Sequence, residues 1–284
     1  MVEYATPRSG DATGRTDLGP VPWLLGAAIA VLLVGVTSPL VSLASGARPL
    51  PGAVALARGV AAKNAGHYRR ALADFRRSAG AGNSPAMIWL GRLYERGAGA
   101  PLNYAKATRW FRKAAAAGSG RAMAEIGLLH YRGRGVPVDY AKAMKWFRKG
   151  AAAGSGRAMT DVGILYDHGR GVPVDYATAM KWYRKGAAAG SRWAMLNIGL
   201  LYYSGHGVPL NYAKAMRWYR KGAAAGSGTA MSNVGLLFAD GDGVPVDYGK
   251  ALAWWRKAAA VGSGVTSASC TRRAKACRWS TLRP

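Results

Sequence analysis

Acidic side chains are scarce in this sequence of 284 residues. It has 13 Asp and Glu against 40 Lys and Arg, which gives a formal net charge of +27. Such a charge attracts polyanions in general, and by itself it does not distinguish nucleic acid, anionic lipid and acidic polysaccharide. The charge therefore narrows the class of partner without naming the partner.

Cysteine is nearly absent, because the only two, Cys270 and Cys277, lie in the last fifteen residues. No pair is placed to crosslink the main part of the chain, and no Cys/His cluster has the spacing of a zinc site. Two interpretations of the pair remain open: a disulfide across a small terminal loop, or two free thiols in the tail.

Motifs for catalysis are also missing. No serine begins a Ser-x-x-Lys motif, which excludes serine–lysine acylation. The four histidines, His67, His130, His168 and His206, lack the spacing of metal ligands. The glycine pairs lack the Lys-Ser/Thr of a phosphate-binding loop. We therefore expect no enzyme, no metal, no cofactor and no small-molecule substrate.

Charge is absent from residues 18–47. Within this run, the stretch Val21–Ala44 is long enough to cross a bilayer, which takes about 20 apolar residues, and Trp23 suits the membrane interface. A secretory signal peptide is the alternative, because Ala44 and Ala47 each end a small-x-Ala pattern typical of a cleavage site. We favour an uncleaved single-pass anchor, since the preceding tail is long and the apolar run exceeds a normal signal core. For the repeats, we favour the periplasmic or extracytoplasmic side over the cytoplasmic side, which is the alternative.

Repetition dominates the rest of the chain. From Ala86 the sequence aligns without a gap in five rows of 36 residues, and a half unit before them matches the second half of a row. The rows are Ala86–Arg121, Ala122–Arg157, Ala158–Trp193, Ala194–Thr229 and Ala230–Val265. Tandem units of this length indicate a solenoid, in which each unit buries its apolar face against its neighbours.

The predicted organisation has five parts. They are a polar tail (1–20), the anchor or signal segment (21–44), a linker with the start of a partial repeat (45–65), the solenoid (66–265) and a basic tail (266–284). The last part lacks the repeat pattern and carries five bases and no acid, so we expect it to be disordered.

The sequence pattern of each row predicts two helices. In the second row, the first helix spans about Ala122–Arg132 and ends at a Gly-Arg-Gly turn. Asp139 is a good N-cap for the second helix, which runs from about Tyr140 to Ala153 and stops at Gly154. The capping position is Asn103, Asp139, Asp175, Asn211 and Asp247 through the rows.

The repeated pattern resembles the Sel-one-like repeat, a relative of the tetratricopeptide repeat, over residues 86–264. In the third row, the pattern is carried by Ala158, Val162, Gly163, Tyr166, Gly169, Gly171, Val172, Asp175, Ala179, Trp182, Tyr183 and Gly190. The resemblance implies an all-α, right-handed α-solenoid that acts as an adaptor or scaffold for protein complexes, with no catalysis of its own. Cysteine-rich members of the family have been linked to β-lactam binding. Since these repeats contain no cysteine, a hydrolase or β-lactam-binding protein is the least favoured alternative.

The second helix of each row interleaves aromatic and basic residues. On a helical wheel its aromatics lie on or beside the apolar stripe, whereas most of its bases lie on the opposite side. We therefore interpret the tryptophans as packing residues between helices and the bases as a solvated ridge that is most positive near the apolar segment. The ridge lysines are Lys106, Lys113, Lys142, Lys145, Lys149, Lys181, Lys185, Lys214 and Lys221.

The first helices differ most between rows. In related tetratricopeptide solenoids these helices line the concave groove, so the resemblance places the differing residues where a partner would dock. The predicted groove residues are Trp89, Glu95, Glu125, Tyr131, Asp161, Asp167, Asn197, Tyr203 and Asn233. Trp89, Tyr131 and Tyr203 would be the anchors, because interface hot spots favour Trp and Tyr. Neutral drift at exposed positions is the alternative explanation.

Two functions follow from these features. The first is a membrane-anchored scaffold that recruits protein partners through the groove. The second is a basic solenoid that binds anionic lipid, acidic polysaccharide or nucleic acid. Salt distinguishes them, because affinity for a polyanion falls steeply as salt rises and an aromatic-anchored groove responds weakly.

Overall fold

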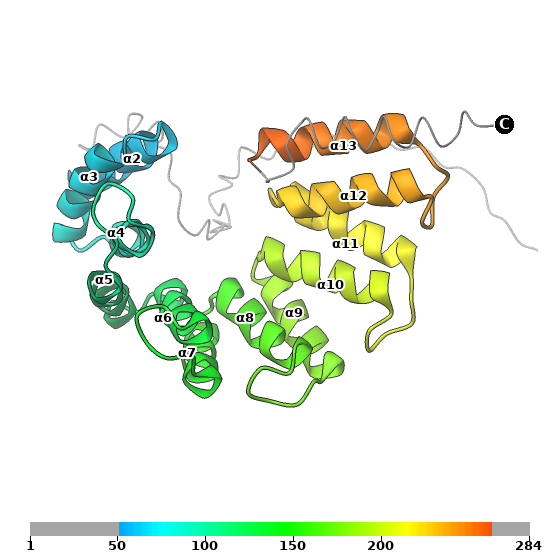
Figure 1. Cartoon of the computed structure of the whole chain (residues 1–284), viewed down its shortest axis with the longest axis horizontal. Coiled ribbons are helices and arrows are strands. Elements are labelled where there is room, and N and C mark those ends of the chain that lie inside the picture. Colours follow the sequence, from blue (N-terminus) through cyan, green and yellow to red (C-terminus); the bar gives the residue numbers. More distant parts are fainter. Residues whose placement is uncertain (1–50, 263–284) are drawn as a thin grey trace, which may run out of the picture. The chain divides into compact units, whose positions relative to one another are not determined.

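The computed structural model describes residues 51–262, which form twelve α-helices and no strand (Figure 1). The predicted helical solenoid is therefore present in this range. None of its helices combines the length and the hydropathy that a membrane span requires. The predicted anchor at Val21–Ala44 and the two cysteines lie outside the described residues.

The helices alternate between two sets. The first helices are α2 (Pro51–Asn64), α4 (Ser84–Arg96), α6 (Gly120–Arg132), α8 (Gly156–Asp167), α10 (Arg192–Ser204) and α12 (Gly228–Asp240). The second helices are α3 (Tyr68–Gly80), α5 (Tyr104–Ala116), α7 (Tyr140–Ala152), α9 (Tyr176–Ala188), α11 (Tyr212–Ala224) and α13 (Tyr248–Ala260). Since α2 packs against α3, the helical stack includes residues 51–64, which lie in the segment predicted as a linker with the start of a partial repeat (45–65).

The predicted helix ends are confirmed. The side chain of Asp139 accepts a hydrogen bond from the backbone N–H of Lys142 at 2.8 Å, at the start of α7. Gly154, just after the end of α7, takes the left-handed backbone with φ of 78°. Because the same two signals recur, the second helices of all five rows have 13 residues.

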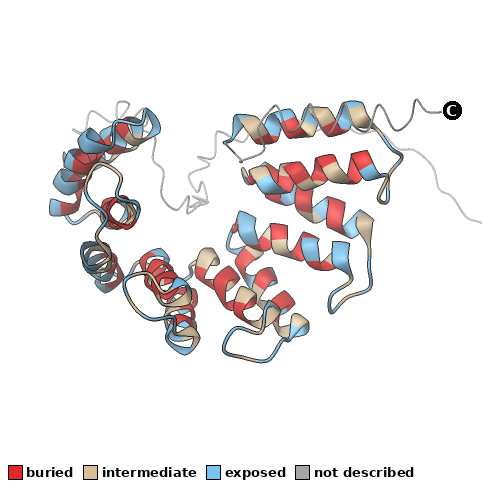
Figure 2. Ribbon diagram, in the orientation of Figure 1, coloured by how far each residue is buried: buried red, intermediate tan, exposed pale blue. Residues whose placement is uncertain are grey.

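The helices pack in chain order, each against the next, and buried residues line the sides that face each other (Figure 2). The first helices also reach across repeats, since α6 contacts α8 and α8 contacts α10. No two second helices of the described range approach each other to the same extent. The layer of first helices is thus the more closely spaced one, which makes it the inner side of the stack along α6–α10.

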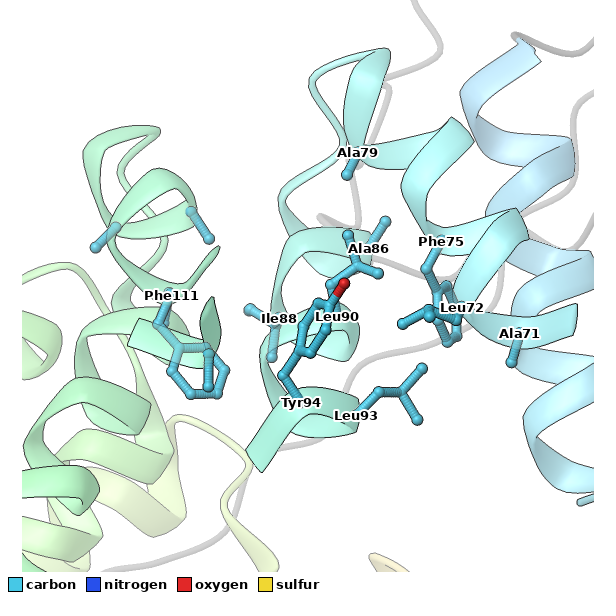
Figure 3. Close-up of a cluster of buried hydrophobic side chains, with 14 of the residues drawn as sticks. Ala71, Leu72, Phe75, Ala79, Ala86, Ile88, Leu90, Leu93, Tyr94 and Phe111 are labelled. Carbon is cyan, nitrogen blue, oxygen red and sulfur yellow. The ribbon is translucent and has the colours of Figure 1, made fainter. Parts of the chain in front are cut away.

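The core of each repeat joins an aromatic ring to a glycine. Phe147 of α7 is 1% exposed and lies on Gly127 of α6, where an added Cβ would come within 2.4 Å of the ring. Glycine inside a helix is destabilising by about 0.5–1 kcal/mol relative to alanine, and here it lets the ring approach the first helix. Figure 3 shows the corresponding ring of Phe111 beside α4. Leu90, also on α4, points from this helix toward α3.

The recurring tryptophans of the second helices are half-buried and pack against the core clusters, as predicted; they are Trp110, Trp146, Trp182, Trp218 and Trp254. One detail differs from the helical wheel. The ammonium group of Lys149, which the wheel places opposite the aromatics, lies over the Trp146 ring at 5.1 Å from its centre. The long lysine stem reaches back one turn to the ring, so the charge and the aromatic residue share one site.

Candidate partner-binding surface

Three of the predicted groove residues are buried, although the row comparison predicts exposed positions. Glu95, Glu125 and Asp161 are 8%, 7% and 3% exposed. A buried carboxylate needs a paired cation, and each of these has an arginine. These carboxylates are therefore buried inside the stack in ion pairs and are not free to contact a partner.

The arginine partners of two of these residues come from a neighbouring repeat. Arg92 of α4 donates to Glu125 of α6, with an Nε to Oε1 distance of 3.1 Å. Arg134, just after α6, donates to Glu95 of α4 at 2.7 Å. These ion pairs connect successive first helices along the inner layer.

Asp161 pairs within its own helix. Arg157, one turn earlier in α8, donates through Nε to both carboxylate oxygens at 3.1 and 3.0 Å. Burial raises the pKa of the Asp161 carboxyl from 3.8 to about 6, and Arg157 opposes this effect. Keeping the Asp161 carboxylate ionised in this buried position therefore lowers the free energy of unfolding.

The remaining polar residues of the predicted groove, Asp167, Asn197 and Asn233, lie where the core ring is a tyrosine. Where the core ring of an adjacent second helix is tyrosine, its hydroxyl needs a partner. Tyr183 donates a hydrogen bond to Asp167 at 2.8 Å. The Asn197 and Asn233 side chains donate to the hydroxyls of Tyr183 and Tyr219. Burial is the main cause that raises the pKa of both tyrosines. Much of the difference between rows therefore has a packing reason.

The three predicted anchors differ in exposure. Trp89 is half-buried, stacks on Phe75 at 6.0 Å and has Lys63 and Arg92 over its ring at 4.7 and 5.3 Å. Tyr131 is half-buried and packs edge-on against a neighbouring tyrosine. Tyr203 is 37% exposed. Only Tyr203 presents a substantial surface to a partner.

Two further residues of α10 are exposed, and the row comparison did not select them. Trp193 is 38% exposed and Leu200 is 41% exposed, and they lie seven residues apart on one face of the helix. Trp193 occupies a position that carries Arg121 and Arg157 in earlier rows, so the replacement of arginine by tryptophan was a readable signal. We call Trp193, Leu200 and Tyr203 the α10 patch.

The α10 patch differs from the other exposed apolar residues. Leu102, Val138, Val174, Leu210 and Val246 recur at one turn position in every row. Among the first helices of the five rows, α10 alone exposes large hydrophobic side chains within residues 51–262. The Trp193 ring is flanked by the guanidinium groups of Arg157 and Arg192 at 5.7 and 5.5 Å. Its surroundings are therefore aromatic and cationic together.

The basic residues of the predicted ridge are all exposed, as expected from the helical wheel. They are Lys106, Lys113, Lys142, Lys145, Lys149, Lys181, Lys185, Lys214 and Lys221. Between α5 and the turn after α6 lies an open pocket of about 590 Å³, lined by Arg109, Arg112 and Lys113. Within the described range, no three His, Cys, Asp or Glu side chains gather in a way that could hold a metal ion.

The Sel1 repeat family model matches residues 84–119, 120–155, 156–191, 194–227 and 228–263. A Sel1 repeat protein from Oxalobacter formigenes is 31% identical, with a TM-score of 0.60 over 79% of this chain and 99% of that one. A protective antigen of uropathogenic Escherichia coli with an SLR fold is 28% identical, with a TM-score of 0.55 over 85% of this chain and 55% of that one. An immunity protein from Pseudomonas aeruginosa is 17% identical over 82% of this chain and 85% of that one, and its TM-score of 0.55 shows a shared fold alone. Comparison with curated proteins found no match.

Proposed function

We propose that this chain, which belongs to the Sel1 repeat family, is a membrane-anchored adaptor that holds a partner protein on the α10 patch. Sel1 repeat solenoids are general scaffolds for protein–protein interaction and typically lack catalytic activity. The adaptor role and the anchor are the parts that go beyond the family. The α10 patch is the single observation that carries the adaptor role.

Three properties of the α10 patch support a protein partner. Its tryptophan and tyrosine are the residue types that contribute most to binding when a partner buries them. It lies on a first helix, in the closely spaced layer, where neighbouring repeats contribute to one surface. The half-buried Trp89 and Tyr131 lie on first helices nearer the N-terminus and would extend the contact along this layer.

Site-specific photo-crosslinking in cells tests this function. A photoreactive residue at position 200, on the α10 patch, should capture a defined partner, and the same residue at position 145, on the exposed side of α7, should not. Trp193→Ala together with Tyr203→Ala should remove the crosslink from position 200, since the anchors would be gone. Lys181→Ala together with Arg217→Ala is the matched control, because both side chains are exposed on second helices.

Two outcomes would contradict the adaptor function at α10. One is equal capture from positions 200 and 145. The other is a crosslink from position 200 that persists in the Trp193→Ala/Tyr203→Ala variant while circular dichroism shows an intact helical fold. In either case the partner surface would have to lie elsewhere on the solenoid.

The uncharged stretch Val21–Ala44 supports the anchor, because it exceeds the length needed to cross a bilayer. An anchored chain stays in the membrane fraction during alkaline carbonate extraction, and a chain cleaved after Ala44 or Ala47 is released and shorter. Protease added outside intact cells or spheroplasts should digest the repeats, as the extracytoplasmic orientation requires. Protection of the repeats until the cells are lysed would reverse the orientation.

A further inference from the structure

The second helices carry a dense set of cations with almost no compensating acid. Each of α5, α7, α9, α11 and α13 has three or four Lys and Arg, all of them exposed, and none contains Asp or Glu. We call these bases the outer basic face. Within residues 51–262, only Lys142 and Lys250 of this face pair with a carboxylate, and in both cases it is the N-cap of the same helix. The inner layer, by contrast, pairs its buried acids with arginines.

The tryptophan rings beside the outer basic face are already covered by lysine side chains. Lys113, Lys149, Lys185, Lys221 and Lys257 each lie over the tryptophan three residues earlier, at 4.5–5.1 Å from the ring centre. Single-stranded nucleic acid binds by stacking its bases on open aromatic side chains. The outer basic face offers no open platform of this kind, so a ligand would have to be recognised through its charge alone.

The spacing of the helices restricts the shape of the ligand. Because the first helices form the closely spaced inner layer, the second helices lie on the outer side of the stack along α6–α10. A flat bilayer touches an outward-curving face over only a few repeats. Duplex DNA is also stiff, with a persistence length of about 50 nm, and bends over such a face at a cost. A flexible linear polyanion follows the face without either restriction.

The face also contains a depression that fits an anionic group. The pocket of about 590 Å³ lies between α5 and the Gly135–Val136 turn of the next repeat. Arg109, Arg112 and Lys113 line it, together with the hydroxyl-bearing Thr108. Guanidinium groups bind carboxylates with two parallel hydrogen bonds, and three cations at one opening concentrate the positive charge there.

We propose that the outer basic face binds a linear acidic polysaccharide, whose carboxylates lie along successive second helices and enter the pocket beside α5. This binding uses different helices from the α10 patch and does not depend on it. The polysaccharide is chosen over lipid and nucleic acid because it combines flexibility, repeated anionic groups and the absence of bases that need stacking.

The test is binding of the full chain to polygalacturonate, a linear sugar polymer with one carboxylate on each unit, with neutral dextran of the same length as the control. We expect binding to polygalacturonate only. The affinity should fall steeply between about 50 and 200 mM salt, because neutralised anions release their counterions.

Two variants with the same change in net charge distinguish the effect of the outer basic face on binding from the effect of net charge alone. The outer variant is Lys145→Gln, Lys181→Gln and Arg217→Gln, which removes one exposed base from each of α7, α9 and α11. The inner variant is Arg96→Gln, Arg121→Gln and Arg132→Gln, which removes three exposed bases from first helices. Both lower the formal charge by three. The outer variant should lose about tenfold in affinity for polygalacturonate and should show a weaker salt dependence, whereas the inner variant should change little.

Three outcomes would overturn the proposal. Equal losses in the two variants would mean that net charge alone attracts the polymer. Binding to vesicles rich in anionic lipid that is tighter than binding to polygalacturonate, and that weakens in the outer variant but not in the inner one, would assign the face to a membrane. Tighter binding to single-stranded DNA of matched charge would show that the lysines leave the tryptophan rings when bases approach.

Discussion

The first and second helices of this solenoid divide the charged residues between them in opposite ways. In the first-helix layer, Glu95, Glu125 and Asp161 are buried, and each pairs with a half-buried arginine. In the second helices of the five rows, the bases are exposed, and within residues 51–262 only Lys142 and Lys250 pair with a carboxylate. One layer thus buries its acids in ion pairs, two of which join neighbouring repeats, whereas the other layer keeps its charges available to a ligand.

The two layers also differ in how their sequences vary. The second helices change little from row to row, because one pattern must place a ring on a glycine, a tryptophan against the core and a lysine over that tryptophan. The first helices vary because each must suit the ring and the charges next to it. Variation between repeats is therefore a poor guide to binding unless the side chain is also exposed, as it is at Trp193.

The contact that joins the two layers should have the largest effect when it is broken. Phe147 is fully buried between α7 and Gly127 of α6. Phe147→Ala removes the ring and leaves a cavity in the middle of the stack, which should lower the free energy of unfolding by about 3–5 kcal/mol. Urea unfolding followed by circular dichroism measures this loss.

Lys145→Ala, in the same helix, is the control for Phe147→Ala. Its side chain is exposed, so the unfolding free energy should change by about 0.5 kcal/mol or less. Similar effects of the two substitutions would mean that the layers are not joined through the ring.

The repeat pattern predicts the fold well and the binding surface poorly, for physical reasons. Helix ends depend on local chemistry, so Asp139 and Gly154 were readable from the sequence alone. Burial of Glu125 depends on Arg92, which lies 33 residues earlier on another helix. A pairing across repeats has no local signal, and a charged residue on a helix is ordinarily taken as exposed. The exposure of Leu200 likewise has no signal in the sequence, because its equivalents in the adjacent rows, Ile164 and Leu236, are also apolar.

Asp161 should make the inner layer sensitive to pH. Its pKa is about 6 in the folded chain and 3.8 as the ordinary value, and this interval corresponds to roughly 2–3 kcal/mol. Because the pKa of Asp161 is higher in the folded chain than in the unfolded chain, the protonated carboxyl stabilises the fold at a pH below the ordinary pKa. This stabilisation is lost as the pH rises through the pKa of the folded chain. The stability of Asp161→Asn relative to the native chain should therefore increase from about pH 4 to about pH 6 and then level off.

Urea midpoints of the two chains, measured over this range, check the Asp161 prediction. The lost hydrogen bonds to Arg157 shift the whole curve by a constant amount, so the slope with pH is the informative quantity. A difference that stays constant with pH would mean that the carboxyl titrates in the folded chain as it does in the unfolded chain. The two layers would then not differ in their response to pH.

Substitution of a lysine that lies over a tryptophan should have the smallest effect on the free energy of unfolding. Because these lysines contribute little to the fold, the outer layer can use them for binding. Lys221 lies 4.5 Å from the centre of the Trp218 ring, and its side chain is exposed. An exposed cation–π contact is worth about 0.5–1 kcal/mol, so Lys221→Gln should lower the unfolding free energy by about 0.5 kcal/mol. Lys221→Arg keeps a cation over the ring and should restore it, while Arg220→Gln, next to it and exposed, should have little effect. A loss above about 2 kcal/mol from Lys221→Gln would mean that this lysine is needed for the fold, and that the bases of the second helices hold the repeats together as those of the first helices do.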